Sequence, residues 1–136
     1  MPRHARRPRR RADQATIDLL TDYFDAMEAK NFDRLGSYYT DDVSLTFANA
    51  PTITGRDAML NRMTTLLGKV KSLAHPLINV RQEEGGVVIF EVTSIWRFHD
   101  DREVKINACS IFTLVDGKFT DQRIYVDNAP VDLFLS

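Results

Sequence analysis

Residues 87–126 decide the fold, and they read VVIFEVTSIWRFHDDREVKINACSIFTLVDGKFTDQRIYV. The stretch is rich in β-branched and aromatic residues and is divided by Asp100-Asp101 and by Asp116-Gly117. Runs of this composition between turn residues predict consecutive antiparallel strands, here near 87–98, 103–115 and 118–126. A segment near 75–84, which ends before Gly85-Gly86, extends this meander at its start.

Alternation along these strands predicts an apolar inner face with few polar atoms, because successive strand side chains point to opposite faces. The inner set of the strand around residue 92 comprises Val88, Phe90, Val92, Ser94, Trp96 and Phe98. The next two strands contribute Val104, Ile106, Ala108, Ser110, Phe112 and Leu114, then Thr120, Gln122, Ile124 and Val126.

Upstream of the meander the period changes to that of a helix. Apolar residues at spacings of three and four predict a core-facing helix from Ala12 through about Lys30: Ile17, Leu20, Tyr23, Phe24 and Met27. Asn31 then caps a short second helix, to which we assign Phe32, Leu35, Tyr38 and Tyr39. Thr40-Asp41-Asp42 is interpreted as a turn.

A strand and a third helix complete the first half of the chain. Residues 43–48 alternate as a strand does, and Asn49-Ala50-Pro51 ends the alternation. Thr54 is interpreted as the N-cap of a helix whose face carries Met59, Met63, Leu66, Leu67 and Val70. Helices followed by hairpins predict an α+β domain in which a curved antiparallel sheet wraps three N-terminal helices.

Composition limits the class of protein. A chain of 136 residues, 43% hydrophobic, is expected to form one domain with its own core. Its single cysteine, Cys109, forms neither an intramolecular disulfide nor a zinc-binding pattern, so we expect no metal and a cytoplasmic location. No apolar run approaches the roughly 18 residues of a membrane span, and no secretion signal is evident.

Charge is distributed unevenly along the chain. Six of the eighteen basic residues are arginines within residues 1–11, and the remaining twelve face nineteen acidic residues, a net charge of −7. We therefore predict a basic disordered tail over residues 1–12 and a single domain over 13–136. The acidic body makes nucleic acid an improbable partner, since a nucleic-acid-binding domain presents a basic face.

The order helix, helix, strand, helix, meander carries two further sequence features. TGRDAM (54–59) opens the third helix, and VDGKFTDQRIYVDNAP (115–130), which begins at the meander's last turn, closes the chain. Together they resemble the nuclear-transport-factor-2-like (NTF2-like) superfamily and its SnoaL-like branch, over about residues 13–134. The resemblance implies a cone of bent sheet and three helices around one pocket. It also implies one of the functions found in that family: a cofactor-free isomerase, polyketide cyclase, dehydratase or epoxide hydrolase, or a non-catalytic binding domain. The fold alone does not distinguish among these functions.

In this resemblance one catalytic residue of the family has a match in the sequence, and several others are replaced by residues of a different type. Tyr23, in the register YFDAMEAKNFDRL, falls where ketosteroid isomerases have their oxyanion-hole tyrosine. The general base and second oxyanion-hole acid of those enzymes correspond to Phe47 and Ser110. Phe47-Ala48-Asn49 resembles the aromatic-x-Asn of limonene-type epoxide hydrolases, but their Asp-Arg-Asp group corresponds to Ser94, Val92 and Ile124. SnoaL-type cyclases place their catalytic aspartate at Ile124 as well.

His75 is the second candidate catalytic residue. HPLIN (75–79) resembles the start of the third strand in scytalone-dehydratase-like members, where a histidine acts as acid and base, and their acid on the first helix corresponds to Glu28. A histidine exchanges protons near neutral pH. We expect pocket-lining, ligand-binding roles for Phe47, Asn49, Phe90, Val92, Ser94, Trp96, Ser110 and Gln122.

These residues lead to two hypotheses. The first is a cofactor-independent enzyme that isomerises, cyclises or dehydrates a lipophilic, oxygenated small molecule of the polyketide or terpenoid kind. The second is a non-catalytic ligand-binding or scaffold domain, because the carboxylates of the best-known mechanisms are missing. On the outer sheet face Ile89, Ile95, Cys109 and Ile111 predict a homodimer.

Overall fold

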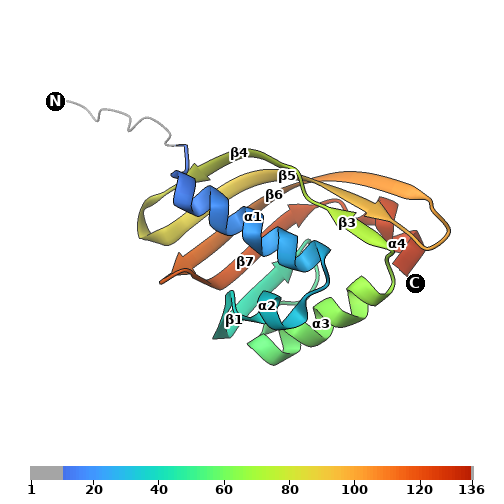
Figure 1. The fold of residues 1–136 in the computed structure, drawn as a ribbon, viewed down its shortest axis with the longest axis horizontal. Coiled ribbons are helices and arrows are strands. Elements are labelled where there is room, and N and C mark those ends of the chain that lie inside the picture. Colours follow the sequence, from blue (N-terminus) through green and yellow to red (C-terminus); the bar gives the residue numbers. More distant parts are fainter. Residues whose placement is uncertain (1–10, 136) are drawn as a thin grey trace.

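The computed structural model describes residues 11–135 (Figure 1). Its helices are α1 (Gln14–Glu28), α2 (Phe32–Gly36), α3 (Arg56–Gly68) and α4 (Ala129–Leu135), with a short 3-10 turn at Glu84–Gly86. Its strands are β1 (Tyr39–Phe47), β2 (Ile53–Thr54), β3 (Ser72–Ala74), β4 (Leu77–Gln82), β5 (Val87–Arg97), β6 (Glu103–Val115) and β7 (Lys118–Val126). The predicted α+β architecture, with helices packed on a curved sheet, is confirmed.

The sheet has seven strands in the order β2-β1-β7-β6-β5-β3, and β4 pairs with β5 beyond β3 along the same edge. Figure 1 shows α1 lying across one face of this sheet and α4 at the end near the C-terminus. The meander pairs are antiparallel as predicted. One pair departs from the prediction, because β1 runs parallel to β7.

The helix α1 begins where its sequence predicts. Asp13 is the N-cap, and its carboxylate accepts a hydrogen bond of 2.8 Å from the backbone N–H of Thr16. Its apolar stripe, which includes Leu20, Tyr23 and Phe24, is buried against the sheet.

No helix among residues 11–135 is both long and apolar enough to cross a membrane.

Two predictions of local structure are wrong. Helix α2 ends at Gly36, and Tyr39 and Thr40-Asp41-Asp42 belong to β1, because Tyr39 pairs with Phe119 of β7 and is fully buried. Thr54 lies in β2 and does not cap α3. Gly55 occupies the N-cap position with φ of 101°, a value that favours glycine, and forms no side-chain cap.

The predicted inner face of the sheet is confirmed for β5 and β6, whose buried residues alternate as the sequence indicates. In the predicted segment 75–84 the strand is β4, which begins only after His75-Pro76, and the short strand β3 precedes that dipeptide. In β7 the register shifts between Thr113 and Leu114 of the partner strand. This bulge turns Phe119 fully inward and leaves Thr120 only half-buried.

Most of the predicted basic tail, residues 1–10, lies outside the described residues. The last two residues assigned to it are part of the fold. Arg11 bridges to Arg81 on β4, and the N–H of Ala12 donates to the carbonyl of Val80 at 3.0 Å. Ala12 is buried.

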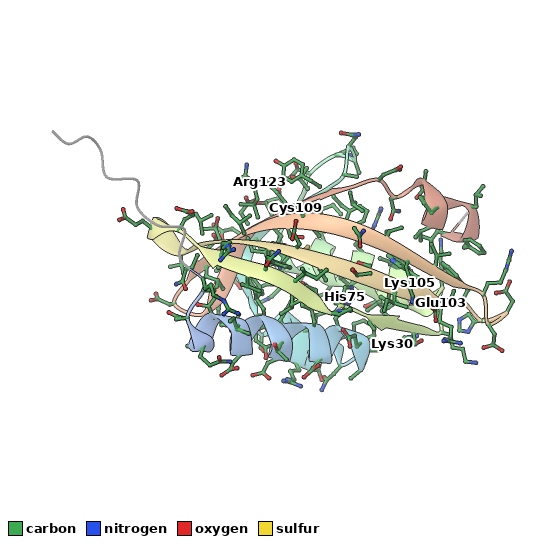
Figure 2. All side chains as sticks on the ribbon, turned by 90° about the horizontal axis from the view of Figure 1, so that it is seen from above. Lys30, His75, Glu103, Lys105, Cys109 and Arg123 are labelled. Atoms are coloured by element: carbon green, nitrogen blue, oxygen red, sulfur yellow. The ribbon has the colours of Figure 1, made fainter. Side chains whose placement is uncertain are left out.

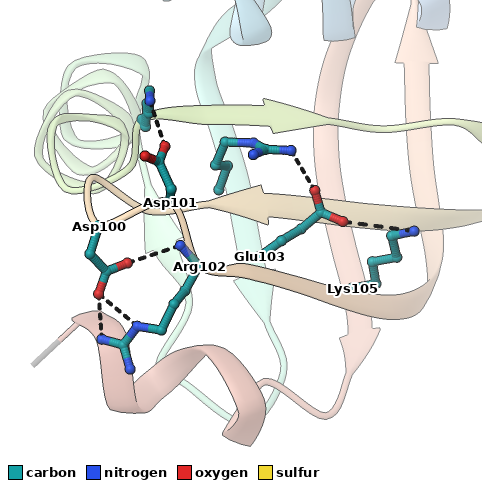
Figure 3. Close-up of polar contacts among 7 residues, drawn as sticks. Asp100, Asp101, Arg102, Glu103 and Lys105 are labelled. Carbon is teal, nitrogen blue, oxygen red and sulfur yellow. Dashed lines mark hydrogen bonds and ion pairs between the residues drawn. The ribbon is translucent and has the colours of Figure 1, made fainter.

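The β5–β6 hairpin carries a cluster of ion pairs and holds α4 (Figure 3). Lys71 contacts Asp101 and Arg102 contacts Asp100, each at 2.6 Å. The Arg102 guanidinium also lies 4.4 Å from the centre of the Phe134 ring, which stacks on Phe98 at 4.5 Å. These contacts anchor the C-terminal helix beside the concave face of the sheet.

Candidate active site: an apolar cavity with buried polar groups

A cavity of about 1020 Å³ lies between the concave face of the sheet and the helices. Its wall comes from the inner residues of β5, β6 and β7, from α1 and α3, and from the start of α4. Most of the lining is apolar, as the alternation of the strands predicts. A cavity of this size and character suits a small lipophilic molecule.

A pair of buried tyrosines lies at one part of the cavity: Tyr23 lines the wall, and Tyr39 is its partner outside the lining. The Tyr23 and Tyr39 hydroxyls are 2.6 Å apart, and the Tyr23 hydroxyl donates weakly, at 3.5 Å, to Oε1 of Gln122. Phe112 and Phe119 pack edge-on against the Tyr23 ring. We call this group of five residues the tyrosine end.

Burial controls the protonation of both tyrosines. Desolvation raises the pKa of Tyr23 to about 12, against smaller opposing effects of its hydrogen bonds to Tyr39 and Gln122. Desolvation also raises the pKa of Tyr39 well above its ordinary value, and the neighbouring Tyr23 adds to the effect. Both phenols therefore remain protonated donors at neutral pH. If Tyr39 donates to Tyr23, the Tyr23 proton is held only by the long contact to Gln122.

His75 forms a dyad with Glu28. Its Nδ1 lies 3.1 Å from Oε2 of Glu28, and the His75 side chain is 9% exposed. The imidazole stacks on Phe24, with ring centres 4.6 Å apart. A carboxylate that accepts from Nδ1–H fixes the tautomer in which Nε2 carries the lone pair, so Nε2 is the atom available to a ligand.

Tyr23 and His75 line the same cavity without touching each other. Phe24 lies between them and contacts both rings, that of Tyr23 at 5.2 Å between centres. Figure 2 labels His75 where the chain passes from β3 to β4 along the sheet. A ligand in the cavity therefore meets a hydroxyl donor and an imidazole on either side of an aromatic ring.

Three buried polar atoms of the described residues have no hydrogen-bond partner: Nε1 of Trp96, Nε2 of Gln122 and Oδ1 of Asn128. All three side chains line the cavity. Unpaired buried polar groups are rare in folded proteins because each loses its hydration without compensation. The unpartnered polar atoms of the described residues are therefore concentrated in side chains of one cavity wall.

Most residues predicted to form the site share the cavity. The lining includes Tyr23, His75, Phe47, Asn49, Val92, Ser94, Trp96, Ser110 and Gln122. Asn49 lies on the exposed turn after β1, which makes it a residue of the rim. Phe90 lies behind the wall, packed on Phe24 and Phe112, so we assign it to the core. Nowhere in residues 11–135 do three potential metal-ligating side chains gather.

The sequence did not identify the lining residue Asn128 or the hydrogen-bond partners of two lining residues, Tyr39 and Glu28. Tyr39 shares strand parity with Val43 and Leu45, a signal that the acidic pair after Thr40 concealed. Glu28 was matched to an acid of related dehydratases but not assigned to the site. Asn128 follows the last strand, where it bonds Asp132 through Nδ2 at 2.8 Å, and no sequence pattern marks its Oδ1 as buried.

A curled sheet closed by helices around an apolar cavity defines a protein of the NTF2-like class. The family model described as SnoaL-like domain matches residues 20–122, and the chain belongs to this family. A comparison with curated protein sequences found no match.

Solved structures confirm the fold. An LEH-like epoxide hydrolase from M. tuberculosis is 20% identical, with 88% of this chain and 87% of that chain covered and a TM-score of 0.73. A putative SnoaL-like polyketide cyclase from Jannaschia sp. CCS1 is 18% identical, with 98% and 97% covered and a TM-score of 0.74. TerC, co-crystallised with polyporic acid, is 13% identical, with 88% and 96% covered and a TM-score of 0.74.

Proposed function

We propose that this protein is a cofactor-independent enzyme of the cytoplasm that moves a proton on a lipophilic, oxygenated molecule. The products would be those of isomerisation, cyclisation or dehydration. The observation that carries the proposal is the His75–Glu28 dyad, 3.1 Å between Nδ1 and Oε2, whose histidine lines an apolar cavity that Tyr23 also lines. The polyketide cyclase and epoxide hydrolase among the similar structures support small-molecule chemistry in this fold.

In the proposed reaction, His75 on one side of Phe24 transfers the proton, and Tyr23 on the other side binds the substrate oxygen. His75 removes a proton from the carbon beside a substrate carbonyl through Nε2, and Glu28 stabilises the imidazolium that forms. Tyr23 donates a hydrogen bond to the oxygen on which negative charge develops, while Tyr39 donates to Tyr23. The imidazolium then returns the proton to another atom of the substrate or to a departing hydroxyl.

The test is exchange of hydrogen for deuterium beside a ketone, which needs no knowledge of the natural substrate. Hexadecanone is incubated with the protein in deuterated buffer, and its mass is followed. We expect His75→Ala to slow the exchange by about 10²- to 10⁴-fold, the usual contribution of a general base. His99→Ala is the matched control, because His99 is exposed, is not among the residues that line the cavity, and hydrogen-bonds the carbonyl of Gly68 at 3.4 Å.

A non-catalytic binding domain is the second candidate function. It is favoured by the absence of carboxylates at inner-strand positions where related enzymes carry them, since Ser94 and Ile124 stand there. Exchange that is equal in the wild type, His75→Ala and buffer, together with saturable binding of hexadecanone, would establish this second function.

We also propose a homodimer packed through the outer sheet face. Ile89, Ile95 and Ile111 are only half-buried there, and Cys109 and Tyr125 are exposed, Tyr125 at 54% (Figure 2 labels Cys109). Light scattering of the purified protein at micromolar concentration measures its mass, and a monomer would remove this proposal.

A further inference from the structure

Two of the unpaired polar atoms are N–H donors held by well-buried side chains. Trp96 is 5% exposed and Gln122 is 1% exposed. Neither Trp96 Nε1 nor Gln122 Nε2 has a partner among the described residues, although both side chains line the cavity. A buried donor without an acceptor destabilises the folded protein, so its presence in a cavity wall indicates an acceptor that a ligand supplies.

The two donors are far apart along the sheet. Trp96 pairs with Val104 of β6, whereas Gln122 pairs with Phe112 of the same strand. Eight residues of strand at about 3.3 Å each give a path of roughly 26 Å, which the bend of the sheet shortens to a smaller direct distance. One small group cannot reach both donors.

The wall between the donors has further polar positions. Ser110 and Ser94 are buried on the same inner face, opposite Phe90 and Ile106 respectively. The other inner residues of this stretch, Val92, Ile106 and Ala108, are apolar. The cavity thus offers a long apolar surface with one neutral donor at each end.

We propose that the ligand is an elongated, mainly apolar molecule with an uncharged acceptor oxygen near each end. Gln122 binds one oxygen and Trp96 binds the other. This inference rests on the proposed function, because it specifies the substrate class of the same cavity. A hydroxyl on such a molecule fits the unpaired acceptor Oδ1 of Asn128.

The charge of the wall excludes a carboxylate or phosphate at these two ends. Both donors are neutral, and the lysine and arginine among the lining residues, Lys69 and Arg62, are exposed. A buried anion needs a cation or several hydrogen bonds to offset its lost hydration, and one neutral N–H does not suffice. Ketone, quinone, ester or lactone oxygens meet the requirement.

Binding can be measured directly because Trp96 is the only tryptophan of the chain. Both nitrogens are shielded from solvent in the protein alone, so a bound oxygen must draw each side chain toward it. The probes are hexadecanedione, with a methyl ketone at each end, and hexadecanone, with one. We expect both to change the Trp96 fluorescence, and the diketone to bind about 5- to 10-fold more tightly, the effect of one additional hydrogen bond.

The variants remove one donor at a time while keeping the shape of the wall. Gln122→Met removes the amide, and Trp96→benzothienylalanine replaces the indole N–H with sulfur. Calorimetric titration replaces fluorescence for the second. Each change is expected to lower the affinity for the diketone about 5- to 10-fold. The affinity for hexadecanone should fall by less than about twofold with either change, because its one carbonyl can bind the remaining donor. A larger loss of affinity for hexadecanone is expected only in the variant that combines both changes.

Thermal unfolding separates a ligand-binding role from a structural one. Since the Trp96 donor is unpaired in the protein alone, its replacement should not lower Tm, whereas Gln122→Met also removes Oε1, the acceptor of the long 3.5 Å contact from Tyr23, and should lower Tm only slightly. Thr93→Val, on the outer face of β5, is the matched control and should leave both affinities unchanged. Equal affinities of the two probes for the wild type, no binding of either, or variants that affect both probes equally would overturn the proposal.

The outcome is independent of turnover. Donor-dependent diketone binding without His75-dependent exchange would retain this inference and remove the enzymatic proposal. Exchange that depends on His75 while both probes bind equally would do the reverse.

Discussion

The β5–β6 hairpin and the tyrosine end of the cavity both gather polar groups, in opposite surroundings. The hairpin joins charged side chains that are a third to two thirds exposed, such as Arg97, Glu103 and Lys105 (Figure 3). The tyrosine end holds neutral groups that are almost fully buried. Exposed pairs exchange readily with water, whereas buried groups depend on their few partners. The number of polar contacts is therefore a poor guide to which residues matter.

The largest expected difference concerns the packing of the two regions. Phe112→Ala should lower the free energy of unfolding by about 3–5 kcal/mol, because Phe112 is 2% exposed and contacts Tyr23, Phe90 and Phe119. Phe134→Ala at the hairpin should cost less than half as much, since Phe134 is only half-buried. Urea unfolding of both variants measures the difference, and equal losses would contradict it.

The second expected difference appears at alkaline pH. Tyr23 has its pKa raised from 10.0 to about 12, so the folded protein holds this proton more tightly than the unfolded chain. The associated stability is complete below pH 10 and is lost as the pH rises through 12. Two pH units correspond to about 2–3 kcal/mol. We expect the urea midpoint to fall steeply between pH 10 and 12.

Tyr23→Phe is the control for this pH dependence. It removes the titrating group, so the midpoint of the variant should fall less over the same interval. An identical slope in the wild type and the variant would mean that other groups control alkaline unfolding.

The contrast between the two regions also explains what the sequence could predict. Alternation identified Ser94, Trp96 and Ser110 as inner residues, because the pattern of a half-buried strand is local. It failed at Tyr39, whose place is determined by pairing with Phe119, eighty residues away in the chain. Local polarity at Asp41 and Asp42 resembled a turn, but both are exposed residues of β1, at the point where its register against β7 shifts.

The sequence predicted which residue types form the site but not which of them contact one another. Tyr23 and His75 were identified from the family resemblance, but their partners Tyr39 and Glu28 depend on how α1, β1 and the β3–β4 connection meet. The unpaired atoms of Trp96 and Gln122 are likewise properties of packing. A sequence pattern shows which face a side chain occupies, not whether its last polar atom has a partner.

The smallest expected change in the free energy of unfolding is at an exposed ion pair of the hairpin. Glu103 accepts from Arg97 at 2.7 Å and lies 3.8 Å from Lys105, yet Glu103→Gln should change the free energy of unfolding by less than about 1 kcal/mol. Water replaces both contacts at little cost, and salt already screens them. Urea unfolding at low and high ionic strength measures the effect. A larger loss that persists in high salt would contradict this expectation, because it would mean that water does not replace the contacts of Glu103 with Arg97 and Lys105.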